Sequence, residues 1–169
     1  KNIIFDFGGV IINIDFKLPE IEFEKLGLKN FLGLYSQLVQ NELFDRLEKG
    51  RISPVEFRKE IRKSIPNPVT DKQIDDAWNA IILDIPAERI KTVEKLKTKY
   101  KTILLSNTNK IHYDFYRADL QRLYGYKHFS DLFHKAWFSF EMGMRKPDAE
   151  IFEYVLEKHK LVPQETLFI

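Results

Sequence analysis

Residues 2–10 read Asn-Ile-Ile-Phe-Asp-Phe-Gly-Gly-Val, a short apolar run that reaches Asp6 and continues into a pair of glycines. The run from Asn2 to Phe5 predicts a buried β-strand with a carboxylate at its carboxyl end. Near-continuous apolar strands are typical of parallel sheets that are covered on both faces. This stretch therefore indicates a strand of a parallel α/β sheet, with Asp6 at the edge where such sheets bind ligands.

Two later stretches repeat this design. Thr102 to Leu105 is apolar and runs into the polar sequence Ser106 to Asn109, and Thr166 to Ile169 is another short apolar run. The apolar spacing predicts an amphipathic helix ahead of each, one beginning near Pro86 and one over residues 148–158. Alternating helices and strands predict an α/β fold built on a doubly wound parallel sheet.

Residues 17–84 differ in character, because they show no convincing strand pattern and several helix-start signals. Residues 53–56 (Ser-Pro-Val-Glu) and 70–73 (Thr-Asp-Lys-Gln) have the pattern of capping boxes, so a helix should begin after Ser53 and another after Thr70. We expect a helical insertion at residues 17–84, within a core formed by residues 1–16 and 85–169.

The composition excludes several classes of partner. The 169 residues contain 27 Lys and Arg against 25 Asp and Glu, without a basic block, so nucleic acid is not an expected partner. The absence of cysteine excludes disulfides and thiolate catalysis and fits a reducing compartment, for which we expect the cytoplasm. No apolar run approaches the roughly 18 to 20 residues of a membrane span, so we expect no membrane partner. The oligomeric state is unknown at this point.

Polar side chains from distant parts of the sequence should meet at one edge of the sheet. Asp6 ends the first strand, Ser106 and Asn107 follow the second, and Lys146 precedes the helix that begins near Asp148. A carboxylate can attack phosphorus, a hydroxyl and nearby amides can hold phosphate oxygens, and a lysine at a helix N-terminus neutralises negative charge. Together these residues predict a site for a phosphoryl group.

Three motifs carry a resemblance to a known family. They are residues 5–10 (FDFGGV), 104–109 (LLSNTN) and 143–148 (GMRKPD), the last followed by Ile151 and Phe152. They resemble the first three motifs of the haloacid dehalogenase superfamily, and the helical insertion resembles its C1 cap. The chain looks most similar to the branch of glucose-1-phosphate phosphatase-like enzymes and the N-terminal phosphatase domain of epoxide hydrolases.

The resemblance implies a Rossmann-like core, dependence on Mg²⁺ and an aspartyl-phosphate intermediate. By motif match the nucleophile would be Asp6, which would also bind the metal together with the Gly8 carbonyl. The residues expected to bind the phosphate or stabilise its charge are Ser106, Asn107, Gly8, Gly9 and Lys146. The implied function is hydrolysis of a small phosphorylated metabolite, with a sugar phosphate as the expected class.

One position departs from the superfamily pattern. Typical phosphatases of the superfamily place a second aspartate, the general acid and base, two residues after the nucleophile, where this chain has Gly8. Loss of such a group costs on the order of 10² to 10⁴ in rate, so either another group replaces it or the leaving group needs little protonation, as an anomeric sugar oxygen does. Asp15 is the candidate replacement, with a surface turn as its favoured alternative. Asn109 and His112 are further candidates for contact with the substrate.

The metal site implied by the resemblance is incomplete in this sequence. Relatives continue past a strand like Leu167 to Ile169 into acidic residues that complete the magnesium site. We therefore expect the natural chain to continue with an acidic pair just beyond Ile169, so that the C-terminal part of the core is missing here. The residues present should hold magnesium weakly or not at all, since a hard cation needs several oxygen ligands.

Substrate choice should depend on the insertion, because insertions vary while a rigid sheet holds the chemistry. Tyr35 and Arg46 could point toward a substrate, although packing and solvent exposure are the favoured roles.

Three other functions stay open. A haloacid dehalogenase uses the same aspartate to attack carbon, needs no metal and also lacks the second aspartate, but no arginine occurs between Asp6 and Arg46 to bind a halide or carboxylate. A receiver-type signalling domain has similar residues but is shorter and lacks the insertion. A degenerate phosphatase kept as a binding module is the third, with Gly8 as its sequence hint.

Overall fold

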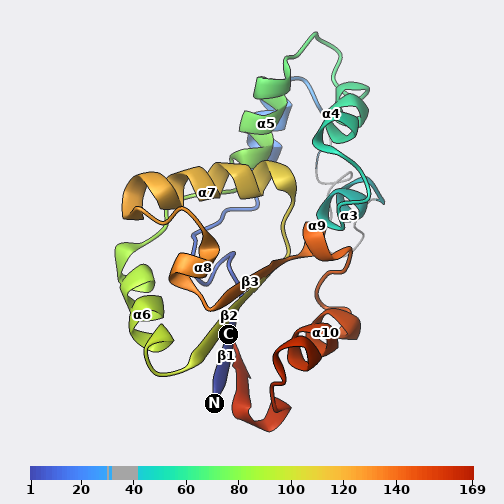
Figure 1. Ribbon diagram of the computed structural model, residues 1–169. Coiled ribbons are helices and arrows are strands. Elements are labelled where there is room, and N and C mark those ends of the chain that lie inside the picture. Colours follow the sequence, from blue (N-terminus) through green and yellow to red (C-terminus); the bar gives the residue numbers. More distant parts are fainter. Residues whose placement is uncertain (30, 32–41) are drawn as a thin grey trace.

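A computed structural model of the chain describes residues 1–29, 31 and 42–169. Helices cover both faces of a four-stranded parallel sheet (Figure 1). The strands are β1 (Asn2–Phe5), β2 (Lys101–Ser106), β3 (Lys135–Phe138) and β4 (Thr166–Phe168), in the spatial order β3-β2-β1-β4. The predicted α/β fold is confirmed, and β3 is a strand that the sequence did not predict.

The described helices follow the chain in a simple order. They are α1 (Leu18–Lys25), α3 (Glu42–Glu48), α4 (Pro54–Arg62), α5 (Asp71–Asn79), α6 (Ala87–Lys97), α7 (Lys110–Tyr124), α8 (Phe129–Leu132), α9 (Ser139–Met142) and α10 (Ala149–His159), with a short 3₁₀ turn at Pro163–Glu165. Across the described ranges, none of these helices has the length and apolar character that a membrane crossing requires.

Each strand of the sheet centre presents alternate side chains to opposite layers of helices. Ile3 and Phe5 of β1 pack with residues of α6, α7 and α8, whereas Ile4 packs with Ile151 and Val155 of α10. Burial of each such side chain stabilises the fold by about 1.5–3 kcal/mol relative to exposure. The two buried faces explain why the strands read as continuous apolar runs.

The order of the strands places Asp6 at a topological switch point. The chain passes from β1 to β2 and β3 on one side, and then returns to pair β4 with the other side of β1. The Asp6 N–H donates a hydrogen bond to the Ile169 carbonyl oxygen at 2.7 Å, so the end of β4 adjoins Asp6. In open α/β sheets, ligands bind in the crevice outside the carboxyl ends of strands at such a point.

The helices between β1 and β2 form a second lobe, which we call the cap. Figure 1 shows α3, α4 and α5 beyond the carboxyl edge of the sheet. The lobe has its own buried cluster, which includes Phe23, Phe44, Phe57 and Trp78. Ile111 of α7 joins the same cluster, so the cap packs directly on the helix that follows β2.

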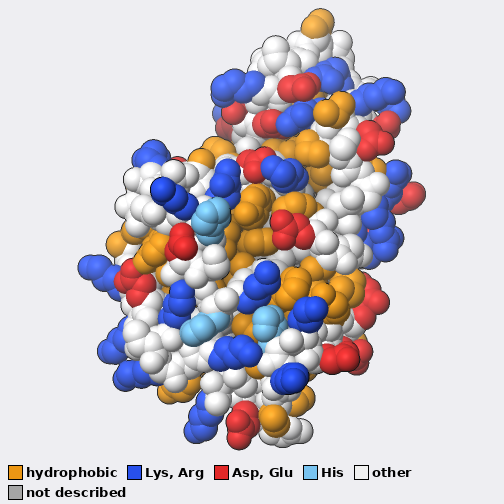
Figure 2. Space-filling model, in the orientation of Figure 1, with side chains coloured by type: hydrophobic (Ala, Val, Ile, Leu, Met, Phe, Trp, Pro, Cys, Tyr) orange, Lys and Arg blue, Asp and Glu red, His pale blue; other side chains and the backbone are white. Residues whose placement is uncertain are grey.

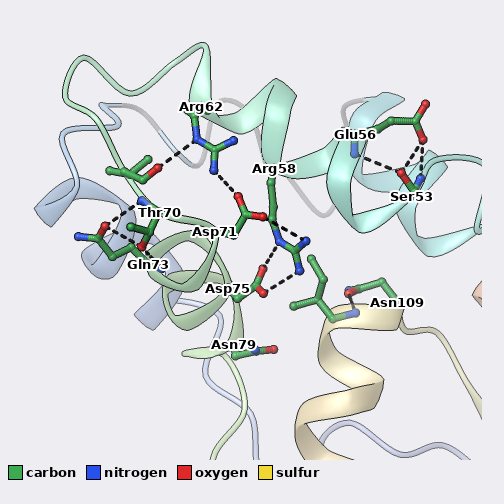
Figure 3. A network of polar contacts seen from close by, with 12 residues as sticks. Ser53, Glu56, Arg58, Arg62, Thr70, Asp71, Gln73, Asp75, Asn79 and Asn109 are labelled. Carbon is green, nitrogen blue, oxygen red and sulfur yellow. Dashed lines mark hydrogen bonds and ion pairs between the residues drawn. The ribbon is translucent and has the colours of Figure 1, made fainter.

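Polar contacts set the geometry of the cap helices (Figure 3). Ser53 and Thr70 form the two predicted capping boxes, at the starts of α4 and α5. The Arg58 guanidinium of α4 donates two hydrogen bonds to the Asp75 carboxylate of α5, each at 2.8 Å. This paired geometry fixes orientation as well as distance, and it holds the two helices in register.

A two-stranded link joins the cap to the sheet. The Asn13 N–H donates to the Asp84 carbonyl oxygen, and the Asp15 N–H donates to the Ile81 carbonyl oxygen, both at 2.9 Å. The segment 10–16, which we call the flap, is thereby held over the carboxyl edge of the sheet. The proposed domain boundaries, after residues 16 and 84, fall at the ends of this link.

A close approach between Gly50 of the cap and Phe140 of α9 gives the first prediction. A Cβ on Gly50, whose φ is 63°, would lie 2.1 Å from the Phe140 carbonyl oxygen, whereas a Cβ on Gly125, with a φ of 76°, would meet nothing within 4 Å. Both replacements carry the strain of positive φ, but Gly50→Ala also forces two backbones apart. We expect Gly50→Ala to lower the free energy of unfolding in urea by about 1–3 kcal/mol more than Gly125→Ala. Equal losses would contradict this contact.

Candidate active site

The carboxyl edge of the sheet opens into a cavity of about 420 Å³ between the core and the cap. Its lining includes Asp6 after β1, Ser106 at the end of β2, and Lys146 from the loop before α10. The sequence predicted that these groups would meet, and the structure brings them together.

The Asp6 carboxylate is held by two donors on one of its oxygens. Lys146 Nζ lies 2.7 Å from Oδ1, and the Phe7 N–H donates to the same oxygen at 2.7 Å. Oδ2 has no partner within the described part of the chain. A carboxylate with one oxygen anchored and the other without a partner is held in a fixed orientation while one oxygen stays available to a ligand.

Lys146 is fixed by the main chain around it. Its Nζ also donates to the Leu105 carbonyl oxygen at 2.8 Å. The Asn107 side chain accepts from the Lys146 N–H and donates to the Lys146 carbonyl oxygen, both at 2.8 Å. Burial lowers the pKa of Lys146, and the nearby charge of Asp6 opposes that shift by favouring the ammonium form. Asn107 lines the cavity but uses its carboxamide to position Lys146, a contact that the sequence did not predict.

The loop after β2 is anchored by a second reciprocal contact. The Thr108 N–H donates to Ser139 Oγ, which donates in turn to the Thr108 carbonyl oxygen, both at 2.9 Å. Both residues are buried, and Thr108 lines the cavity. Ser106 Oγ makes only a long contact, 3.4 Å, with the Asn107 carbonyl oxygen. The loop is therefore rigid, whereas the Ser106 hydroxyl can turn toward a ligand.

The two glycines after Asp6 have different positions. Gly8 lines the cavity, and a Cβ there would lie 3.3 Å from Ile14 Cδ1 of the flap. Gly9, with a φ of 78°, donates its N–H to the Ile12 carbonyl oxygen at 2.8 Å and is not part of the lining. The Gly9 N–H is thus used within the turn, and its role in phosphate binding stays a prediction.

Apolar side chains from the flap and the cap form much of the remaining wall. They are Ile12, Ile14, Phe16, Trp78, Ile81 and Ile82. Figure 2 shows hydrophobic side chains grouped near the centre of the visible face, with positive and negative side chains interspersed around them. A wall of this kind reduces the contact of water with the apolar part of the cavity.

Ion pairs tie the cap to the loop that carries Lys146. Arg145 Nε lies 3.1 Å from Glu48 Oε2 and its Nη1 lies 3.8 Å from Asp45 Oδ1, while Lys49 Nζ lies 3.8 Å from Asp148 Oδ2. The side chains of Glu48 and Arg145 are only 12% and 19% exposed, and both line the cavity. The sequence analysis did not identify Glu48 as a residue of the cavity. The residues around it in the sequence do not distinguish it from a charged residue on the solvent-exposed face of a helix.

His112, in the first turn of α7, lines the cavity and touches two consecutive cap residues. Its Nδ1 lies 2.9 Å from Asn79 Oδ1, and its ring stacks on Trp78 with the centroids 4.5 Å apart. Burial lowers the pKa of His112 to about 3, so the imidazole is neutral at physiological pH.

The other candidates do not line the cavity. The Asp15 carboxylate accepts a hydrogen bond from the Lys17 N–H at 2.8 Å, which fits the surface-turn role. Asn109 Oδ1 caps α7 by accepting from the N–H groups of Ile111 and His112. Roles for Asp15 and Asn109 in the reaction stay predictions. Arg46 Nη1 lies 4.0 Å from Glu42 Oε1 on the same helix. Tyr35 lies outside the described residues.

The parallel α/β sheet, with a cavity at the carboxyl ends of its strands, is the fold of a class of hydrolases. The family model for haloacid dehalogenase-like hydrolases matches residues 1–169. The chain is also 32% identical, over 169 residues, to the D-ribitol-5-phosphate phosphatase of Bacteroides thetaiotaomicron, covering 100% of this chain and 82% of the relative. The chain belongs to the haloacid dehalogenase-like hydrolase family.

Two solved structures are similar along nearly the whole chain. A variant of a haloacid dehalogenase family enzyme from Bacteroides thetaiotaomicron, in complex with magnesium and inorganic phosphate, has a TM-score of 0.93 and 39% identity, covering 99% of this chain and 83% of its own. A predicted haloacid dehalogenase-like family hydrolase from Porphyromonas gingivalis has a TM-score of 0.88 and 32% identity. The match covers 99% of this chain and 80% of that protein's chain.

The contact between Asp6 and Lys146 gives a prediction about protonation. Asp6→Asn removes the charge that raises the pKa of Lys146 and leaves the burial that lowers it, so we expect a lower Lys146 pKa in the variant. An NMR titration of the Lys146 ε-methylene signal measures this value. Asp15→Asn, the same change outside the cavity lining, is the matched control and should not move it. An unchanged or higher Lys146 pKa in Asp6→Asn would show that the ion pair is not made in solution.

Proposed function

We propose that this protein is a magnesium-dependent phosphatase that hydrolyses a small phosphorylated metabolite, of the sugar phosphate or polyol phosphate class. The observation that carries the proposal is the anchored Asp6 carboxylate, whose Oδ1 is held by Lys146 and Phe7 and which lines the same cavity as Ser106. The similarity to a D-ribitol-5-phosphate phosphatase supports the substrate class.

The proposed reaction has two displacements at phosphorus. Asp6 Oδ2 attacks the phosphoryl group, the bond from phosphorus to the ester oxygen breaks, and the leaving oxygen takes a proton from water to become the alcohol. Water then attacks the same phosphorus, which releases inorganic phosphate and restores the carboxylate. Lys146 and the Ser106 hydroxyl stabilise the negative charge on the phosphoryl oxygens in both steps.

Oxygen donors near Asp6 fit part of a magnesium site. Within the described ranges, no group of three or more His, Cys, Asp or Glu residues could hold a metal. The Asp6 carboxylate and the Gly8 carbonyl would supply two oxygen ligands to the metal. Bound magnesium would neutralise charge on the phosphoryl group.

Protonation of the leaving alcohol needs a group other than Gly8. The carboxylates in the described cavity lining belong to Asp6 and Glu48, and Glu48 is paired with Arg145. Glu48 and Arg145 therefore add polar groups to a wall that is otherwise largely apolar, which suits a leaving group with hydroxyls on a short carbon chain.

We place the activity in the cytoplasm, since a reducing compartment suits a chain without cysteine.

Phosphate release by the full-length protein tests this function, with D-ribitol 5-phosphate, glucose 1-phosphate and a nucleotide as substrates. We expect magnesium-dependent turnover that falls by about 10³ or more in Asp6→Asn. Asp119→Asn, on the surface of α7 and paired with Arg122, is the matched control and should retain turnover. Wild-type rates in Asp6→Asn would rule out covalent catalysis by Asp6.

Three further measurements separate the other functions. Chloride release from 2-chloropropionate without magnesium would indicate a dehalogenase. Persistent phosphorylation of Asp6 by acetyl phosphate would indicate a receiver-type domain, and phosphate ester binding without turnover would indicate a binding module.

A further inference from the structure

His112 is the buried histidine of the cavity wall, and the cap determines how its ring lies. The residue is only 9% exposed, and two consecutive cap residues contact its ring, Trp78 by stacking and Asn79 by a hydrogen bond. The imidazole therefore belongs to the core by sequence and takes its orientation from the cap.

The contact with Asn79 also determines which ring nitrogen carries the proton. Asn79 Oδ1 is a carboxamide oxygen and can only accept, so His112 Nδ1 must donate at 2.9 Å. In a neutral imidazole the other nitrogen, Nε2, then has a lone pair and no proton. In the described part of the chain no group pairs with Nε2, and this atom is not among the side-chain atoms that are both fully buried and unpaired, so a ligand can reach it.

An accessible acceptor that the described residues leave without a partner, on a residue of the cavity wall, is available to a hydrogen-bond donor on a ligand. The cavity that His112 lines is also lined by Asp6, Ser106 and Lys146, which bind the phosphoryl end of the ester in the proposed function. The part of the substrate that reaches His112 is thus the leaving group.

We infer that His112 is a specificity-determining residue whose Nε2 accepts a hydrogen bond from a hydroxyl of the leaving group, with Asn79 fixing the tautomer. The inference rests on the proposed phosphatase function and names what the site recognises, a phosphate ester of a polyhydroxylated carbon chain. Because Nε2 carries no proton, His112 selects the leaving group and does not protonate it.

The test compares two esters that differ in their hydroxyls, D-ribitol 5-phosphate and pentyl phosphate. His112→Phe keeps an aromatic ring against Trp78 and removes the acceptor. We expect kcat/KM for D-ribitol 5-phosphate to fall by about tenfold, the effect of one hydrogen bond, and kcat/KM for pentyl phosphate to stay unchanged. His128→Phe, at an exposed histidine outside the cavity lining, is the control and should change neither.

Two results would overturn the inference. Equal losses for both esters would mean that His112 only supports the structure, and no loss for either would mean that it does not contact the leaving group. Failure of the unsubstituted protein to cleave either ester is a different outcome, which would remove the proposed phosphatase function and the inference with it.

A measurement on the ring itself does not depend on folding of His112→Phe. In the Asp6→Asn protein, nitrogen NMR should show the His112 proton on Nδ1. Addition of D-ribitol 5-phosphate should shift the Nε2 signal, and pentyl phosphate should not. A proton on Nε2 in the free protein, or equal shifts with the two esters, would contradict the inference.

Discussion

The ion pair between Asp6 and Lys146 joins two distant stretches of the chain, and the site depends on it. Its 2.7 Å contact requires β1 and the loop before α10 to meet at one edge of the sheet. The strand order β3-β2-β1-β4 brings this about, because β4 returns to pair with β1 and places the switch point at Asp6. Asn107 then holds the Lys146 backbone from the end of β2, so three segments converge on one carboxylate.

The cap supplies the rest of the site through contacts that reach the same loop. Arg145, which directly precedes Lys146, is paired with Glu48 of α3. Trp78 and Asn79, at the end of α5, hold the His112 ring. The walls of the cavity therefore come from both lobes, and movement of the cap would change the environment of the reacting groups without changing the sheet. Such closure is a common way to exclude water from a reaction.

Local signals were enough to predict most of the fold and the meeting of Asp6, Ser106 and Lys146 in one cavity. The capping residues Ser53 and Thr70 predicted the starts of α4 and α5, and apolar runs predicted three of the strands. The strand β3 was missed because Lys135 is exposed and Trp137 is only half-buried, which hides the apolar pattern. Likewise, the pairing of Glu48 with Arg145 depends on the docking of separate elements, which no local pattern encodes.

The central claim is that Asp6 forms a covalent bond to phosphorus during turnover. Borohydride reduces an acyl phosphate to an alcohol, so treating acid-quenched enzyme after a short exposure to substrate would convert a phosphorylated Asp6 into homoserine. Mass spectrometry of the peptide that contains residues 2–10 then measures the change directly. The account predicts homoserine at position 6 only when substrate is present. Turnover without that modification, or with modification of a different carboxylate, would contradict it.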